Sequence, residues 1–361
     1  MKIGIIGTGK LGLCKALCLD AEGYDVYCYD INLSYLEAIK NKTLQSNETS
    51  VQDMLSKSNL KISNNEEEIL QACEVIFVYI QTPSTSAGNY DHSYIDNFVD
   101  KCIQFGKQPI KKIIAISSTV MPEYTDSVYN KLNEYNYDIC YNPTFIAQGS
   151  IIANLINPNL ILIGGSNRES LDTIEAIHKT IVKNDTTFHK MTPLEAEITK
   201  ISINCFITTK ISFANMVGDL LMSKDINPEK VLDAVGADCR IGNRYLKYGF
   251  GFGGPCFPRD NKALNYYADS QGFNFQLCKS TDDLNKSHLL FQFNSLKDSN
   301  KPIEFTYITY KDNSDILEES QKLKLAVMLA EHGCKVIINE RYYIIEKLKQ
   351  QYGNVFEYII I

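Results

Sequence analysis

One cysteine stands out by its surroundings. Residues 249–260 place Cys256 in a glycine-rich loop between aromatic residues, and the charged pair Arg259 and Asp260 follows it. Glycines allow a backbone to approach a ligand closely, and a thiol held beside cationic groups can ionise and act as a nucleophile. Cysteines are also common in protein cores, so a surface loop with an inert cysteine explains this stretch equally well when it is taken alone.

A long helical pattern over residues 192–224 carries a second candidate site. Lys200 and Asn204 are four residues apart and therefore share one helix face. A lysine and an amide on one face could donate hydrogen bonds to a developing oxyanion. The alternative is a surface pair of Glu197 with Lys200, next to a helix-interior asparagine. A helix of this length also indicates a connector between domains and a dimer surface.

The N-terminal segment has the order of a dinucleotide-binding unit. Residues 2–6 and 25–30 predict strands, and a helical pattern lies between them. The first strand leads into a G-x-G-x-x-G motif made of Gly7, Thr8, Gly9, Lys10, Leu11 and Gly12. The first two glycines permit a tight turn and close approach to a pyrophosphate at the helix N-terminus, and the third permits helix–strand packing.

The acidic residue after the second strand bears on the choice of cofactor. Asp30 can accept hydrogen bonds from the adenosine ribose hydroxyls, and it would repel a 2′-phosphate. We therefore expect NAD rather than NADP. A flavin site or a decayed Rossmann site is the alternative.

Strands and helices alternate through the first half of the chain, which predicts an α/β fold with a Rossmann-like, doubly wound parallel sheet. Further strands are expected at residues 74–79, 113–117, 137–141 and 160–164. Ligands bind outside the carboxyl ends of the strands in such a sheet. Polar clusters that include Thr82, Pro83, Thr119 and Thr144 follow three of these strands. Each cluster could be an ordinary turn, but their joint placement favours a cofactor cleft.

The end of the chain repeats this alternation on a smaller scale. Strands are expected at residues 303–308 and 335–339, and helices at 319–332 and 341–351. A chain of 361 residues is too long for one ordinary core. We expect a Rossmann domain at residues 1–190, a central helical domain for dimerisation and catalysis at 191–290, and a smaller α/β domain at 291–361.

The composition excludes several classes of protein. A formal net charge of −7 gives no basic footprint for nucleic acid, and no apolar run is long enough to span a bilayer. The eleven cysteines are scattered and contain no C-x-x-C pair, which fits neither a zinc framework nor a secreted disulfide ladder. We therefore expect a cytoplasmic protein that has reduced thiols and no bound metal.

Together these motifs resemble the UDP-glucose/GDP-mannose dehydrogenase family, in the family's order and over nearly the whole chain. The most specific motif is the cysteine loop at residues 251–260. The other matching motifs are residues 7–12, 82–83, 118–120, 142–143, 197–204, 210–213 and 238–242. Tyr310, Lys311 and Asp315 are similar to the start of the family's UDP-binding domain.

The resemblance implies an enzyme that oxidises the C6 alcohol of a nucleotide sugar to a carboxylate in two NAD-dependent steps. Cys256 would be the nucleophile and would hold the sugar as a thiohemiacetal and then as a thioester. Lys200 and Asn204 match the oxyanion-stabilising pair of the family, and Asp260 matches its aspartate for water and proton handling. Thr119 lies where the family places a water-holding threonine.

The same resemblance implies the binding residues. UDP-glucose is the expected substrate, and it would lie along residues 245–253. Arg240 matches an arginine that reaches in from a neighbouring subunit, which implies a homodimer, and Arg259 would contact the NAD phosphate. The substrate contacts expected in full are Thr144, Phe145, Ile146, Gln148, Lys200, Asn204, Arg240, Tyr245, Tyr248, Phe250, Gly253 and Lys311.

Departures from the family pattern keep other functions open. Thr144 and Gln148 stand where the family has glutamates, and neither can serve as a base at neutral pH. Leu317 replaces an expected arginine, and the chain ends at Ile361, short of the family's usual end, so the UDP-binding domain is expected to be shortened. The alternatives are a dehydrogenase of another nucleotide sugar, such as GDP-mannose or a UDP-N-acetylhexosamine, and a weakly active nucleotide-sugar-binding protein.

Overall fold

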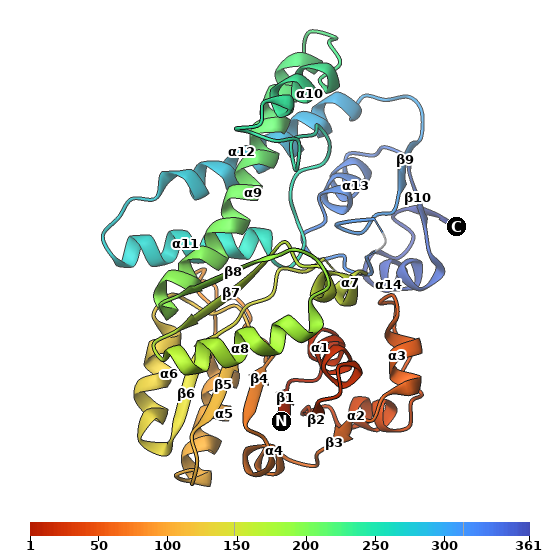
Figure 1. The fold of residues 1–361 in the computed structure, drawn as a ribbon. Coiled ribbons are helices and arrows are strands. Elements are labelled where there is room, and N and C mark those ends of the chain that lie inside the picture. Colours follow the sequence, from red (N-terminus) through yellow and green to blue (C-terminus); the bar gives the residue numbers. More distant parts are fainter. Residues whose placement is uncertain (148, 313) are drawn as a thin grey trace. The chain divides into compact units, whose positions relative to one another are not determined.

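The computed structural model describes residues 1–147, 149–312 and 314–361, and the chain forms two compact units, Met1–Lys200 and Ile201–Ile361 (Figure 1). Gln148, one of the expected substrate contacts, lies outside the described residues. Within them, no helix is both long and apolar enough to cross a membrane.

The first unit is built on one eight-stranded sheet with the strand order β3-β2-β1-β4-β5-β6-β7-β8. Its strands are β1 (Lys2–Ile6), β2 (Asp25–Tyr29), β3 (Lys61–Ile62), β4 (Val75–Val78), β5 (Lys112–Ile116), β6 (Tyr137–Tyr141), β7 (Leu160–Gly165) and β8 (Thr187–Met191). Its helices are α1 (Lys10–Ala21), α2 (Leu33–Lys40), α3 (Val51–Lys57), α4 (Glu66–Ala72), α5 (Ser93–Phe105), α6 (Tyr124–Leu132), α7 (Ile151–Ile156) and α8 (Arg168–Ile181), with a 3₁₀ turn at Asn133–Tyr135.

Helices cover both faces of this sheet. Successive residues of a strand point to opposite faces, so on β4 Val75 and Phe77 belong to one hydrophobic core and Ile76 and Val78 to the other. Helices α1, α2, α3, α7 and α8 contribute to the first core, and α4, α5 and α6 to the second. The α/β fold with a doubly wound sheet is therefore confirmed.

The predicted parallel sheet has one antiparallel pair, because β7 runs antiparallel to β6. The other neighbouring strands pair in parallel, including β7 with β8. A crossover to a parallel strand has to return along the whole strand length. Among the described residues between β6 and β7, the only helix is α7, whose 6 residues span about 9 Å. The chain therefore turns back at the edge of the sheet where β6 ends.

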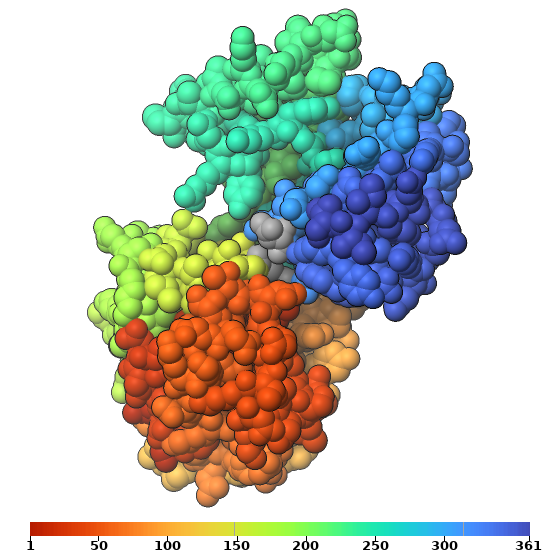
Figure 2. All heavy atoms as spheres, turned by 90° about the vertical axis from the view of Figure 1, so that its right-hand side faces the viewer, coloured from red at the N-terminus to blue at the C-terminus, as the bar shows by residue number. Residues whose placement is uncertain are grey.

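The second unit contains most of α9 (Pro193–Met222), three further helices and a small α/β layer. The helices are α10 (Glu229–Ala237), α11 (Phe257–Ser270) and α12 (Gln276–Leu296). A parallel sheet in the order β11-β10-β9 follows, from β9 (Ile303–Thr306), β10 (Val336–Glu340) and β11 (Glu357–Ile360), with α13 (Gln321–Glu331) and α14 (Tyr342–Tyr352). This layer has its own hydrophobic core and appears in blue in the space-filling view of Figure 2.

Helix α12 was not predicted from the sequence. Its inward positions include Thr281, Asn285 and His288, which are buried although they are polar. Helix prediction relies on apolar residues that recur with the helical period, and polar side chains at the buried positions remove that signal.

Candidate functional site

The glycine motif forms a tight turn between β1 and α1. Gly7 has a φ of +84°, and a Cβ on Gly12 would lie 2.2 Å from the main-chain oxygen of Gly7. The buried hydroxyl of Thr8 donates to the main-chain oxygen of Tyr29 at 3.0 Å, which ties the turn to β2. Among the described residues, no side chain caps the N-terminus of α1 with a hydrogen bond, and no atom lies within 4 Å of a Cβ built on Gly9. A helix N-terminus after such a turn suits the negative charge of a pyrophosphate.

The carboxylate expected to bind the ribose lies at the same edge of the sheet. Asp30 follows the last residue of β2, and its Oδ1 accepts from the main-chain N–H of Asn32 at 2.9 Å. Because this bond uses one lone pair of a half-buried carboxylate, further lone pairs can accept from a ribose diol. The glycine turn, the N-terminus of α1 and this carboxylate together fit NAD.

The polar clusters after β4, β5 and β6 lie at the carboxyl ends of neighbouring strands. Thr82 is buried and donates through its hydroxyl to the main-chain oxygen of Thr119 at 2.7 Å, so the first two clusters are joined. Pro83 is exposed and Thr119 is half-buried. In the third cluster, the buried Asn142 donates to the main-chain oxygen of Leu162 at 2.9 Å, which ties β6 to β7.

Lys200 is buried near the C-terminal boundary of the first unit. Its Nζ lies 4.9 Å from the centre of the Phe145 ring, so two of the expected substrate residues are brought together. A cation over an aromatic face is a favourable contact. Thr144 and Ile146, on either side of Phe145, are half-buried.

The alternative of a surface pair between Glu197 and Lys200 is wrong, because both side chains are buried. The carboxylate of Glu197 accepts from the main-chain N–H groups of Glu123 and Thr125 at 2.7 and 2.8 Å, at the N-terminus of α6. Burial raises the pKa of Glu197 to about 7. Glu197 thus fixes α9 against α6 one turn before Lys200.

Cys256 lies at a helix start. It is the N-cap residue of α11 and is exposed, so the residue assigned to a loop by the sequence analysis also begins a helix. The N-terminus of a helix stabilises negative charge, including that of a thiolate. The glycine before Pro255, Gly254, has a φ of +77°, and a Cβ there would lie 2.5 Å from the ring of Tyr310. The loop can follow this path only because that position is glycine.

Asp260 and Asn204 meet in the second unit. Asp260 lies one turn after Cys256 on α11 and is only 2% exposed. Its Oδ2 accepts from the side-chain amide of Asn204 at 2.7 Å, and its Oδ1 lies 3.7 Å from Nε of Arg259. Asn204 of α9 therefore fixes the carboxylate of the residue that lies one turn after Cys256. The start of α11 thus brings together Cys256 and three other expected site residues, which are Arg259, Asp260 and Asn204.

The other expected substrate residues differ in their surroundings. The side chain of Arg240 is 84% exposed and pairs with Asp238 at 2.7 Å. Tyr245, Phe250 and Lys311 are exposed, Tyr248 is half-buried and Gly253 is buried. Leu317, the residue in place of the family arginine, packs against the core of the small α/β layer.

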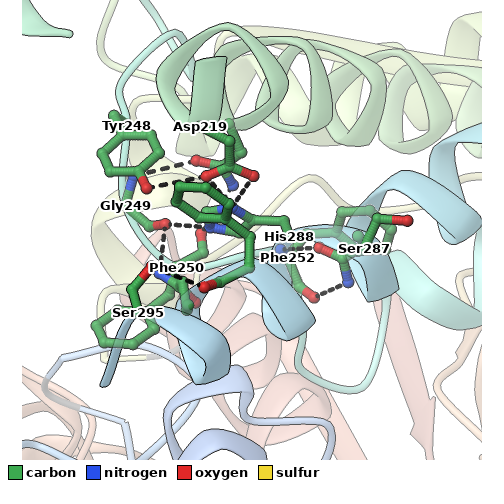
Figure 3. A network of polar contacts seen from close by, with 12 residues as sticks. Asp219, Tyr248, Gly249, Phe250, Phe252, Ser287, His288 and Ser295 are labelled. Carbon is green, nitrogen blue, oxygen red and sulfur yellow. Dashed lines mark hydrogen bonds and ion pairs between the residues drawn. The ribbon is translucent and has the colours of Figure 1, made fainter. Parts of the chain in front are cut away.

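Several residues that hold the substrate segment were missed by the sequence analysis. Side chains from α9 and α12 bond directly to the main chain of residues 249–252, and Figure 3 shows part of this network. They are Asn215, Asn285, His288 and Gln292, with Asp219 bonded to His288. Their only signal in the sequence is the spacing of three and four residues between Asn285, His288 and Gln292, which puts them on one face of a helix.

Comparison with known proteins gives one family for both units. Residues 1–182 match the NAD binding domain of the UDP-glucose/GDP-mannose dehydrogenase family, and residues 194–287 match the central domain of that family.

Named relatives agree with this match. The chain is 30% identical over 352 residues to UDP-glucose 6-dehydrogenase TuaD of Bacillus subtilis, which covers 93% of this chain and 75% of that protein. It is 28% identical over 356 residues to UDP-glucose 6-dehydrogenase of Rickettsia felis, covering 95% and 77%. The solved UDP-glucose dehydrogenase of Pyrobaculum islandicum has a TM-score of 0.90 at 26% identity, over 100% of this chain and 86% of that one.

A second solved structure supports the fold alone, because its identity is low. The UDP-D-ManNAc dehydrogenase of Pyrococcus horikoshii has a TM-score of 0.80 at 22% identity, over 94% of this chain and 83% of that one. The family models, the relatives and the dinucleotide turn at the start of α1 lead to one conclusion. The chain belongs to the UDP-glucose/GDP-mannose dehydrogenase family and is an NAD-dependent dehydrogenase of a nucleotide sugar.

Proposed function

We propose that the substrate is UDP-glucose and the product UDP-glucuronate. The observation that carries this proposal is the placement of Cys256 at the N-terminus of α11, with Asp260 one turn later and bonded to Asn204. A thiol at that position suits an oxidation that passes through a covalent sulfur intermediate. Two relatives and one solved neighbour above 25% identity that carry the UDP-glucose name support the choice of sugar.

In the proposed mechanism Cys256 attacks the C6 aldehyde formed by the first oxidation and holds it as a thiohemiacetal. The second oxidation gives a thioester, and water hydrolyses it, so one alcohol and one water yield a carboxylate and a free thiol. Bound NAD would supply the hydride acceptor for both oxidations, and the hydroxyl proton released in each oxidation would pass to solvent. Lys200 and Asn204 donate hydrogen bonds to the oxygen on C6 when it carries negative charge. Asp260 takes protons from Cys256 and from the attacking water.

The replacement of two family glutamates bears on the rate of hydrolysis. Thr144 can hydrogen-bond to a water but cannot take its proton at neutral pH. Loss of one general base slows a reaction by about 10²- to 10⁴-fold, which leaves the nucleophile and the oxidations intact. Asp260 would serve as the remaining base. Thr144→Glu is expected to speed thioester hydrolysis, and an unchanged rate in single-turnover experiments would show that another base is used.

A homodimer is proposed from one face of α9. Phe206, Phe213 and Leu220 are spaced by seven residues, lie on one helix face and are 65%, 43% and 63% exposed. Large apolar side chains gathered on one face mark an interaction surface. Arg240 of each subunit would reach the nucleotide sugar of its neighbour. Phe213→Glu should give monomers in analytical ultracentrifugation, and a wild-type protein that sediments as a monomer would contradict the proposal.

We also propose the domain boundaries that the sequence predicts. Residues 1–190 would bind NAD, residues 191–290 would carry Cys256 and the dimer surface, and residues 291–361 would form a shortened UDP-binding domain with Lys311 as a contact. A protein limited to residues 1–190 would test the first boundary, since it should bind NAD in calorimetry without turning over any sugar.

The experiment that tests the activity is an assay of the purified protein with UDP-glucose and NAD. Two NADH formed per sugar acid are expected. Turnover only with GDP-mannose or a UDP-N-acetylhexosamine would show that this nucleotide sugar, and not UDP-glucose, is the substrate. Tight binding of nucleotide sugar without NADH formation would identify a weakly active binding protein instead.

A further inference from the structure

The segment that precedes the reactive cysteine has no regular secondary structure, and side chains satisfy its main-chain groups. The N–H of Gly249 donates to Oδ1 of Asn215 at 3.1 Å. The N–H of Phe252 donates to Oδ1 of Asn285 at 3.0 Å, and the oxygen of Phe252 accepts from Nδ2 of Asn285 at 3.0 Å. A segment held in this way has the conformation that its side-chain partners allow.

The main-chain oxygen of Gly249 has the closest of these partners. It accepts from Nε2 of His288 at 2.7 Å and from the side-chain amide of Gln292 at 3.2 Å. On its other side, Nδ1 of His288 lies 2.9 Å from both carboxylate oxygens of Asp219. Figure 3 shows the histidine between the carboxylate of α9 and the oxygen of Gly249. The His288 side chain is 3% exposed.

The contacts of His288 fix its protonation. A main-chain oxygen can only accept, so Nε2 carries a proton. An ionised carboxylate can also only accept, so Nδ1 carries a second proton and the ring is an imidazolium.

Asp219 is well placed to remain ionised. Its Oδ1 also accepts from the hydroxyl of Tyr248 at 2.9 Å, and the ring of Tyr248 meets the His288 ring edge-on with centroids 5.6 Å apart. The carboxylate therefore serves two donors, one on α12 and one on the segment itself. Hydrogen bonds between charged partners are about twice as strong as neutral ones, so the cation binds the Gly249 oxygen more firmly than a neutral ring would.

We propose that His288, held as an imidazolium by Asp219, is a positioning residue that sets the path of residues 248–252 and so the affinity for the nucleotide sugar. The kinetic part rests on the proposed function, in which the sugar lies along residues 245–253. His288 does not touch the reacting atoms. Its effect passes through the main-chain oxygen of Gly249, seven residues before Cys256.

The protonation is tested directly on the wild-type enzyme by nuclear magnetic resonance of isotope-labelled histidine at about pH 7. The signal of His288 is assigned by its loss in His288→Gln. Both ring nitrogens are expected to carry protons, and Asp219→Asn is expected to convert the ring to its neutral form because the buried cation loses its partner. A neutral ring in the wild-type enzyme would overturn the proposal.

The positioning role is tested by steady-state kinetics of His288→Gln. KM for the nucleotide sugar should rise roughly 10- to 100-fold, as expected for the loss of a charged hydrogen bond. The value of kcat should change by less than about threefold, and KM for NAD should not change. Gln292→Met removes a neutral donor from the same oxygen and should raise KM less. His332→Gln, at an exposed histidine of the same unit, is the control that should change nothing.

The two proposals fail separately. The assay uses whichever nucleotide sugar the wild-type enzyme oxidises, so a substrate other than UDP-glucose corrects the proposed function and leaves this comparison in place. If the wild type oxidises none, the dissociation constant for UDP-glucose replaces KM. A His288→Gln protein that melts like the wild type and keeps its KM, or its dissociation constant, would overturn the positioning role.

Discussion

Two glycine-rich loops lead into helix N-termini in this molecule, and different parts of the chain shape them. In the loop before α1, the atoms that exclude a Cβ from Gly7 and Gly12 are main-chain atoms of β4's end and of the turn itself. In the loop before α11, a Cβ on Gly251 would meet the side chain of Asn285, and one on Gly254 the ring of Tyr310. The first loop is shaped by its own backbone and sheet. The second is shaped by parts of the chain that come later, which are the side chains of Asn285 and Tyr310 and the main-chain oxygen of Glu319, 2.1 Å from a Cβ built on Gly253.

This contrast also separates binding from chemistry. The first loop offers main-chain N–H groups and no reactive side chain, so we expect it to affect cofactor affinity alone. The second presents one thiol and a carboxylate a turn later, so we expect it to affect turnover through these two residues and the affinity for the nucleotide sugar through residues 248–252. Five substitutions test this contrast between the two loops.

The largest effect is expected for Cys256→Ser. A serine hydroxyl cannot replace a thiolate as nucleophile without its own base, so formation of the sugar acid should fall by at least about 10³-fold. The dissociation constant of NAD, measured by calorimetry, should stay at the wild-type value. Normal four-electron turnover in this variant would show that the chemistry does not pass through the sulfur.

Gly12→Ala should come next. Its Cβ would lie 2.2 Å from the main-chain oxygen of Gly7, and a main-chain atom cannot move aside as a side-chain end can. The free energy of unfolding should fall by about 1–3 kcal/mol, and NAD should bind roughly tenfold or more weakly.

Gly9→Ala is the matched control for that change, because a Cβ on Gly9 meets nothing within 4 Å. It should weaken NAD binding through close approach to the pyrophosphate and leave the free energy of unfolding unchanged. Equal loss of stability in both variants would remove the main-chain argument for the first loop.

Each of the two units also has a buried basic side chain, Lys15 in the first and His288 in the second. The different partners of these two side chains give a third test. Lys15 on α1 is 1% exposed, and its Nζ lies 3.5 Å from Nδ1 of His178, whose Nε2 is 2.8 Å from Oδ1 of Asn142. Because Asn142 donates through Nδ2 to Leu162, its Oδ1 accepts from Nε2 and the lone pair of Nδ1 faces Lys15. Burial lowers the pKa of Lys15 to about 7. His288, by contrast, faces a carboxylate.

The lowered pKa of Lys15 determines whether the free energy of unfolding rises or falls with pH. Above pH 7 the folded protein releases the Lys15 proton that the unfolded chain keeps up to about pH 10.4, so this group makes the free energy of unfolding rise with pH. In urea titrations between about pH 7 and 8.5, Lys15→Met should lack a slope of up to about 1.4 kcal/mol per pH unit. Thiols of the unfolded chain begin to titrate near the upper end of that window, at about pH 8.5, and comparison with the wild type cancels their effect. Parallel curves would contradict the buried-cation argument.

The smallest effect is expected for Gly251→Ala. Its Cβ would lie 2.2 Å from Oδ1 of Asn285, but that oxygen is the end of a side chain that can shift. The free energy of unfolding should fall by less than about 1 kcal/mol, while KM for the nucleotide sugar rises about three- to tenfold. An effect as large as that of Gly12→Ala would show that the two loops are held equally rigidly.

The sequence predicts the first loop well because its determinants are local. Six residues, the flanking strands and Asp30 lie within the first thirty positions, and each acts through a known backbone geometry. The direction of β7 could not be predicted, because the apolar pattern of a strand is the same in both directions. The role of Glu197 was also hidden, since the helix start that it binds lies more than seventy residues earlier.

The second loop was predicted only in part. Cys256 and Asp260 follow from the motif, whereas His288 and Asn285 lie on a helix whose buried face is polar. Hydrophobic periodicity detects helices that bury apolar residues, and it carries no information about side chains that support a distant backbone. Such supports become visible only when contacts between separate parts of the chain are known.

The unbroken length of α9 has a consequence for how this protein can change. Two asparagines on this helix of 30 residues make hydrogen bonds to the loop before α11 and to its first turn. Asn204 bonds to Asp260, and Asn215 bonds to Gly249. Each added residue rotates everything beyond it by about 100° and advances it about 1.5 Å. One insertion between these two asparagines would turn the second away from its loop, and seven would restore the angle but overshoot by about 10 Å. Substitutions can accumulate along α9, but the number of residues between Asn204 and Asn215 has to stay the same.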